Sequence, residues 1–229
     1  MAAVDFKQDI PLFPLPNCVL FPGALLPLHI FEERYRTMMA AALAGQSVIA
    51  MALLKAGWEK EYFGRPEIHP VVCVGKIVGH ERLPDGKYNL LLQGVSRAAL
   101  ENEKNGTFRA ATLTALPDIV PPDSADRLRD CRQKLADLFA NSPLAQLPPA
   151  ASIREMIGSC LPVWNIADVV AFSLIPDCAT KQRLLEMRDV LLRTEELLQI
   201  LNGLAQRKQE PRCGPRPART IFQTPPNMN

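Results

Sequence analysis

The hydrophobic period of the chain changes at residues 116–122, a short segment that holds three prolines. Before this segment, short apolar runs are separated by glycine, proline and asparagine, which is typical of strands and turns. After it, apolar residues recur every three or four positions, which is typical of helices. The 229 residues include 21 prolines, nearly twice the usual share of about 5%, and this disfavours an all-helical fold. We therefore expect an α+β protein in which a β-rich part precedes a helical part.

The first half contains six strand-like runs and one helix. The runs cover residues 10–15, 25–30, 47–54, 71–82, 87–99 and 107–115. Pro84, Asp85 and Gly86 form a turn signal, which predicts an antiparallel meander over the last three runs. Proline cannot donate to a central ladder, so the prolines of residues 10–15 predict a strand at a sheet edge. The helix is expected at residues 31–45, where the apolar period becomes helical.

The second half is expected to form five helices. Four apolar residues recur at helical spacing and predict one buried stripe: Leu128, Cys131, Leu135 and Leu138. Further helices are expected near residues 153–160, at 165–174 with Asn165 as the cap, at 180–187, and at 189–204 with Asp189 as the cap.

The charge distribution argues against nucleic acid as the partner of the folded body. Residues 206–229 carry five basic side chains and one acidic side chain, whereas residues 1–205 carry 21 basic and 23 acidic side chains. A nucleic-acid-binding protein usually presents a basic body or face, because neutralising phosphates drives its affinity. Two interpretations of the tail, residues 207–229, stay open: it binds an acidic partner or RNA, or it is a solvated appendage.

Cellular location is constrained by what the sequence lacks. The start of the chain does not have the pattern of a secretory signal. No apolar run reaches the roughly 18 residues that a membrane-spanning helix needs. The six cysteines include no CxxC pair. We therefore expect a cytoplasmic protein with reduced thiols and no membrane partner.

The usual signatures of catalysis and metal binding are also missing. The sequence contains no P-loop, GxGxxG, HExxH, GxSxG or EF-hand pattern. His29, His69 and His80 have no Cys, Asp or His at ligand spacing, and Cys160 and Cys178 lie in apolar helical contexts, which favours buried packing over a nucleophilic role. We expect no catalytic residue, no metal and no cofactor, and therefore not an enzyme. A hydrolase site assembled in space from distant residues stays open.

Three long stretches are more specific than any of these short patterns. They are IPLFPLPNCVLFPGALLPLHIFEERYRTMM at 10–39, VGKIVGHERLPDGKYNLLLQGVSRAAL at 74–100 and KQRLLEMRDVLLRTEELLQIL at 181–201. In this order they resemble the N-terminal substrate-binding domain of the ATP-dependent Lon protease, and still more the stand-alone bacterial versions of that domain. The resemblance covers roughly residues 8–205.

The resemblance implies a fold and a function. It implies a β-rich PUA-like subdomain at about 8–116, a helical bundle subdomain at about 123–206, and a tail at 207–229 outside both. In Lon an ATPase module and a Ser–Lys protease domain follow, and this chain is expected to lack them. What the resemblance implies is recognition of unfolded or tagged polypeptide segments, or of a specific protein partner, as part of protein quality control. The alternative is an RNA-associated protein, because PUA-like folds also recognise RNA, although this rests on fold analogy alone.

Two surfaces are candidates for partner binding. Trp58, Tyr62 and Phe63 lie in a polar loop at residues 55–70, and aromatic residues with a charged rim are typical of interfaces. The alternative is that they fold back over the β-rich part. Phe13 and Phe21 lie on or near the N-terminal strand, whose expected edge position could accept an added strand. The alternative for this pair is ordinary core packing.

Overall fold

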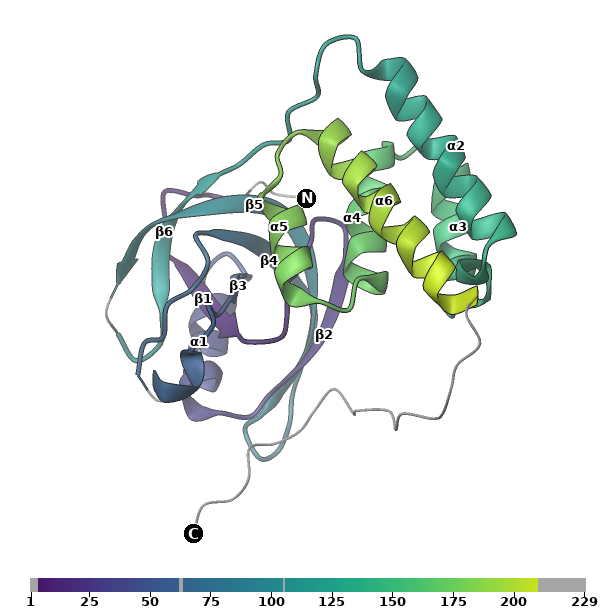
Figure 1. Ribbon diagram of the computed structural model, residues 1–229. Coiled ribbons are helices and arrows are strands. Elements are labelled where there is room, and N and C mark those ends of the chain that lie inside the picture. Colours follow the sequence, from purple (N-terminus) through teal and green to yellow (C-terminus); the bar gives the residue numbers. More distant parts are fainter. Residues whose placement is uncertain (1–3, 62–63, 105, 210–229) are drawn as a thin grey trace.

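The computed structural model describes residues 4–61, 64–104 and 106–209. The α+β expectation is confirmed (Figure 1). The strands are β1 (Ile10–Leu15), β2 (Leu25–Ile30), β3 (Val48–Leu53), β4 (Val71–Arg82), β5 (Tyr88–Lys104) and β6 (Ala110–Ala115). The helices are α1 (Glu33–Ala44), α2 (Ala125–Asn141), α3 (Ala150–Gly158), α4 (Val163–Leu174), α5 (Cys178–Glu186) and α6 (Val190–Gln209), with short 3-10 turns at Trp58–Glu61 and Pro143–Gln146.

The sheet closes on itself because β5 is long enough to serve three neighbours. The strand order is β2-β5-β4-β3-β1-β6, and β6 pairs back onto β5. β2 pairs with the first part of β5, at residues 88–93, and β6 pairs with its last part, at residues 98–104. Five strands therefore form a small barrel, and β2 extends from one end of β5 as an edge strand.

The expected edge position of β1 is wrong. β1 pairs in parallel with β3 over residues 12–15 and antiparallel with β6 over residues 10–11. Each neighbour pairs with only part of β1, so the missing N–H of a proline removes few hydrogen bonds from either ladder. The edge strand is β2, which also carries a proline at position 27.

The two faces of the sheet belong to two separate hydrophobic cores. The smaller core contains alternate residues of β1, β3, β4 and β6 together with Ala98 of β5, and no helix contributes to it, so it fills the inside of the barrel. Several of its members are alanine or valine, which suits a narrow interior. The larger core includes the opposite face of the sheet, the buried face of α1 and the buried faces of α2 to α6. The β-rich and helical parts therefore share one continuous core.

The helices form where their apolar stripes meet this shared core. The buried stripe of α2 contains Leu128, Cys131 and Leu135 as expected, but it continues at Phe139, and Leu138 is only partly buried. The expected cap at Asp189 is confirmed, since its Oδ1 accepts from the amides of the second and third residues of α6.

The expected cap at Asn165 is wrong. Helix α4 begins at Val163, directly after Pro162, so Asn165 lies within its first turn. Proline fixes its own φ and suits the start of a helix, which moves the start upstream of the asparagine.

Candidate functional site

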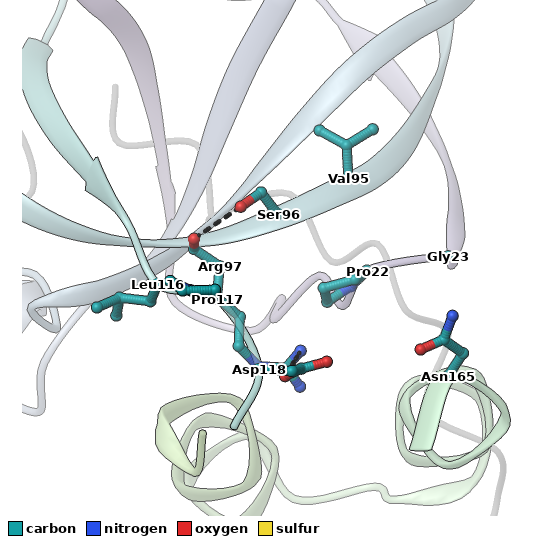
Figure 2. A pocket seen from close by; sticks show the side chains of 9 residues that line it. All are labelled: Pro22, Gly23, Val95, Ser96, Arg97, Leu116, Pro117, Asp118 and Asn165. Atoms are coloured by element: carbon teal, nitrogen blue, oxygen red, sulfur yellow. Dashed lines mark hydrogen bonds and ion pairs between the residues drawn. The ribbon is translucent and has the colours of Figure 1, made fainter. Parts of the chain in front are cut away.

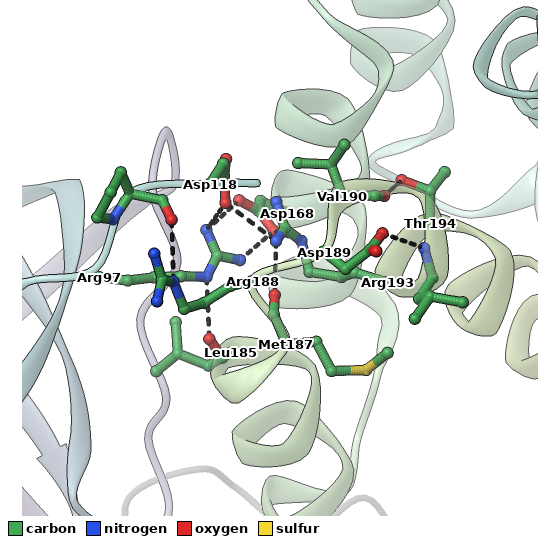
Figure 3. Close-up of polar contacts among 12 residues, drawn as sticks. Arg97, Asp118, Asp168, Leu185, Met187, Arg188, Asp189, Val190, Arg193 and Thr194 are labelled. Atoms are coloured by element: carbon green, nitrogen blue, oxygen red, sulfur yellow. Dashed lines mark hydrogen bonds and ion pairs between the residues drawn. The ribbon is translucent and has the colours of Figure 1, made fainter. Parts of the chain in front are cut away.

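A buried ionic cluster joins the sheet to the helices (Figure 3). Arg97 of β5 forms a two-pronged ion pair with Asp168 of α4, at 2.9 Å from Nη1 and 2.6 Å from Nη2. Arg193 of α6 places Nε 3.1 Å from Asp168 Oδ1 and Nη1 3.0 Å from Asp118 Oδ1. The side chains of Arg97, Asp168 and Arg193 are each 2% exposed, whereas that of Asp118 is 27% exposed. We call Arg97, Asp118, Asp168 and Arg193 the ionic cluster.

Burial and pairing act in opposite directions on the charges of the ionic cluster. Burial raises the pKa of Asp168 despite the opposing effect of Arg97 and Arg193. Burial alone would lower the pKa of Arg97, but the carboxylate of Asp168 outweighs burial and leaves this pKa above its ordinary value. Arg97 Nε also donates to the carbonyl of Leu185, and Arg193 Nη1 donates to that of Met187. The charges are thus paired and held by backbone groups, which is the arrangement of a structural tie.

A cavity of about 300 Å³ lies beside this cluster. It opens where β5 changes partner from β2 to β6, and the loop before β2, the segment after β6 and the start of α4 surround it (Figure 2). Arg97, Asp118 and Asn165 supply charged and amide groups to its lining, together with Ser96. The Ser96 hydroxyl donates to the carbonyl of Arg97 at 2.9 Å, and no histidine is among the lining residues.

Strand β2 carries an exposed apolar stripe that the sequence reasoning missed. Leu25, Pro27, His29 and Phe31 alternate along the strand and are all exposed, with Leu25 at 50% and Phe31 at 54%. The residues between them face the larger core. β2 pairs with β5 on one side, and no other described strand pairs with it. We call Leu25, Pro27, His29 and Phe31 the β2 stripe; LLPLHIF is apolar at every position except His29, so the sequence holds no alternation that would have marked it.

The structure does not bring the expected partner-binding residues together. Trp58 is partly buried and packs against the core inside the barrel, and Tyr62 and Phe63 lie outside the described residues. Phe13 and Phe21 are 5% and 0% exposed, respectively, in the larger core. Phe13 packs against the ring of Tyr35, with ring centroids 4.5 Å apart.

The expected burial of Cys160 is wrong, whereas Cys178 is partly buried. Helix α3 ends at Gly158, so Cys160 falls in an exposed connection instead of on a packed helical face. Among the described residues, no group of three or more His, Cys, Asp or Glu side chains is placed to hold a metal ion. None of the described helices combines the length and apolarity needed to cross a bilayer.

Comparison with known proteins connects this fold to one family. A family model described as the ATP-dependent protease La (LON) substrate-binding domain matches residues 9–203. The Lon protease of Parabacteroides distasonis is 31% identical over 208 residues, covering 85% of this chain and 24% of that protein. The Lon protease of Desulfosudis oleivorans is 24% identical over 198 residues, again covering 85% of this chain and 24% of the relative. The chain thus spans about a quarter of the length of these relatives.

Solved structures support the same fold. The N-terminal domain of the Mycobacterium avium complex Lon protease superposes with a TM-score of 0.66 at 18% identity, covering 85% of this chain and 98% of that domain. A Lon N-terminal domain protein from Xanthomonas campestris superposes with a TM-score of 0.57 at 19% identity, covering 84% and 98% of the two chains. The match in each case lies in the part of Lon that bears the substrate-binding domain, outside its ATPase and protease domains.

Proposed function

Because this chain belongs to the family of LON substrate-binding domains, we propose that it is a non-enzymatic module that binds extended polypeptide segments. Its partners are unfolded or tagged segments, which expose apolar side chains and unpaired backbone groups. ATP hydrolysis and proteolysis reside in parts of Lon that the match does not reach, and we assign neither to this chain. The cytoplasm is the compartment in which we place this activity.

The β2 stripe is the observation that carries the proposal. An edge strand offers its free backbone groups to an added strand, and alternate side chains on that strand select what is added. Leu25 and Phe31, each about half exposed, supply apolar contact at the two ends of the stripe. Fully burying an exposed side chain of this size is worth about 1.5–3 kcal/mol, and because each is already about half buried, a complex gains roughly half of that from each. An extended segment can thus gain both backbone pairing and apolar burial on this strand.

The loop at residues 55–70 is the second surface that we consider. Trp58 already packs against the core inside the barrel, so only part of its ring is available to a partner. We therefore place the main binding surface on β2 and assign Trp58, Tyr62 and Phe63 a secondary role. Phe13 and Phe21 stabilise the core beneath the surface instead of touching the partner, since both are buried.

Fluorescence anisotropy with a labelled, permanently unfolded polypeptide tests the proposal. We expect binding that survives high salt and weakens at least tenfold, about 1.4 kcal/mol, in the double variant Leu25→Ser, Phe31→Ser. The matched control is Leu192→Ser, because Leu192 is 53% exposed on α6 and lies outside the stripe. Trp58→Ala is expected to weaken binding less than the double variant.

Labelled single-stranded RNA in the same assay tests the competing function. Salt-sensitive RNA binding without polypeptide binding would refute the proposal, because phosphate contacts weaken steeply as salt rises. Equal loss of polypeptide binding in the β2 double variant and in Leu192→Ser would refute the placement on β2.

A further inference from the structure

A hydrogen-bonded chain of three side chains crosses the exposed face of the sheet at the β2 stripe. His29 on β2 lies opposite Asn89 on β5, and Asn89 lies opposite Glu81 on β4. His29 Nδ1 lies 2.8 Å from Asn89 Oδ1, and Asn89 Nδ2 donates to Glu81 Oε2 at 3.3 Å. This chain therefore connects the edge strand to the second strand inward.

The donors and acceptors in this chain can be assigned from its chemistry. A carboxylate only accepts hydrogen bonds, so the amide NH₂ of Asn89 must face Glu81. The amide oxygen of Asn89 then faces His29, and an amide oxygen also only accepts. His29 must therefore carry its proton on Nδ1, which leaves the lone pair of neutral imidazole on Nε2.

The imidazole of His29 is held in place as well as held in one tautomer. Its ring stacks on that of Phe31, with centroids 6.3 Å apart and an interplanar angle of 24°. Within the described part of the chain, no protein group pairs with Nε2. The β2 stripe thus presents one oriented acceptor between apolar neighbours, which is the kind of polar group that gives a largely apolar site its specificity.

We propose that His29 Nε2 selects the side chain that a bound segment places opposite it. This inference rests on the proposed function, because it assumes that a polypeptide adds to β2. At neutral pH the lone pair accepts a hydrogen bond from an amide, hydroxyl or ammonium group and repels a carboxylate. The preferred segment therefore has apolar residues at alternate positions and a hydrogen-bond donor among them.

Several charged or titratable side chains lie near His29 in sequence or register. On the same face, the charged group linked to it is Glu81 of β4, through Asn89. Arg82 of β4 lies over the ring of Tyr88, which belongs to the core-facing side. Three other charged or titratable residues are neighbours of His29 in sequence or register. His80 of β4 lies opposite Leu90, which faces the core. Lys87 is paired with Asp85, and Glu32 is paired with Arg34.

The test uses pairs of labelled peptides that differ at one position, glutamine or glutamate, in an otherwise identical host with alternating apolar residues. The variable position is moved along the host one residue at a time, so that it faces His29 in one member of the series. At about pH 7.5 we expect the glutamine peptide to bind about fivefold more tightly, the worth of one hydrogen bond.

The matched variant is His29→Phe, which keeps an aromatic ring beside Phe31 and removes the acceptor. It should bind the two peptides about equally when the variable position faces residue 29. Equal binding of the two peptides by the parent protein, or the same preference for glutamine in His29→Phe, would overturn the inference while leaving the proposed function intact. Absence of peptide binding by the parent protein would refute the proposed function, and the inference with it.

A second measurement tests the tautomer without any peptide. Nitrogen-15 NMR of the parent protein should show the Nδ1–H form of His29 at neutral pH. Asn89→Ala removes the acceptor that fixes this form, so the spectrum should shift toward the Nε2–H form that free imidazole side chains prefer. An Nε2–H tautomer in the parent protein would overturn the assignment of Nε2 as an acceptor.

Discussion

Asp168→Asn removes the one fully buried negative charge of the ionic cluster and changes the shape of the side chain very little. In the parent protein the Asp168 carboxylate lies 2.6 and 2.9 Å from the two Nη atoms of Arg97 and 3.1 Å from Nε of Arg193. After the change, two buried guanidinium groups face a neutral amide, whose NH₂ cannot accept from either. Removing one partner of a buried ion pair typically costs 3–5 kcal/mol. Asp118, at 3.0 Å from Arg193, still offsets part of the positive charge. We therefore expect the free energy of unfolding to fall by an amount near the lower end of this range, about 3 kcal/mol.

Urea unfolding followed by tryptophan fluorescence measures this loss. Trp58 reports on the barrel and Trp164 reports on α4, so the single-tryptophan forms Trp58→Phe and Trp164→Phe separate the two signals. With a slope of about 2 kcal/mol per molar urea, a loss of 3 kcal/mol moves the midpoint by about 1.5 M. Because one core joins the two parts, we expect the two single-tryptophan proteins to unfold at the same urea midpoint.

Asp126→Asn is the control for this prediction. Asp126 pairs with Arg129 at 2.9 Å on α2, but both side chains are more than three-quarters exposed. Exposed pairs contribute about 0–1 kcal/mol, so the control should shift the midpoint by only a few tenths molar. A loss below about 1 kcal/mol for Asp168→Asn would place the ionic cluster among such exposed pairs and would refute our account of it as a buried tie.

Three further predictions concern single positions. Gly94→Ala should destabilise the protein by more than about 2 kcal/mol, because an added Cβ would lie 2.0 Å from a backbone oxygen. In Gly203→Ala the added Cβ meets nothing within 4 Å and should stabilise α6 by up to about 1 kcal/mol. Equal urea midpoints for the two variants would contradict this. Asp177→Ala should cost about 1 kcal/mol at neutral pH. Hydrogen bonds from the first turn of α5 lower the pKa of Asp177, so its stabilisation is present at neutral pH and is lost on acidification through that lowered pKa; a variant-to-parent difference that stays constant down to about pH 2 would disprove the role. In native protein, iodoacetamide should modify exposed Cys160 and spare Cys73, whose pKa is raised by complete burial, and mass spectrometry showing equal labelling would contradict the described burial.

Local pattern was sufficient for most of the fold. The bounds expected for the strands at 10–15, 25–30 and 71–82 agree with β1, β2 and β4. These runs are bounded by turn residues whose effect on the backbone is local, so sequence alone locates their ends. Asp189 was equally predictable, because a cap bonds to amides only two or three residues away.

Pairing partners and the candidate site depend on contacts that local pattern does not encode. The prolines of β1 indicated an edge, yet this strand lies between β3 and β6. The ionic cluster joins residues 71 positions apart, Arg97 and Asp168, and no spacing rule reaches that far. The β2 stripe leaves no alternating pattern in the sequence, and its importance comes from the edge, which is known only once the strand order is known.

The core shared between the sheet and the helices has a consequence for anyone who shortens this chain. Residues 116–122 look like a natural place to cut, since they are mostly exposed and rich in proline. A fragment ending there would keep the barrel interior but would leave the opposite face of the sheet, including Leu92, and Phe21 in the connection from β1 to β2, without the helices that cover them. Such a face is an aggregation surface in water. We expect fragments cut at this segment to precipitate, and those that retain both sides of it to fold.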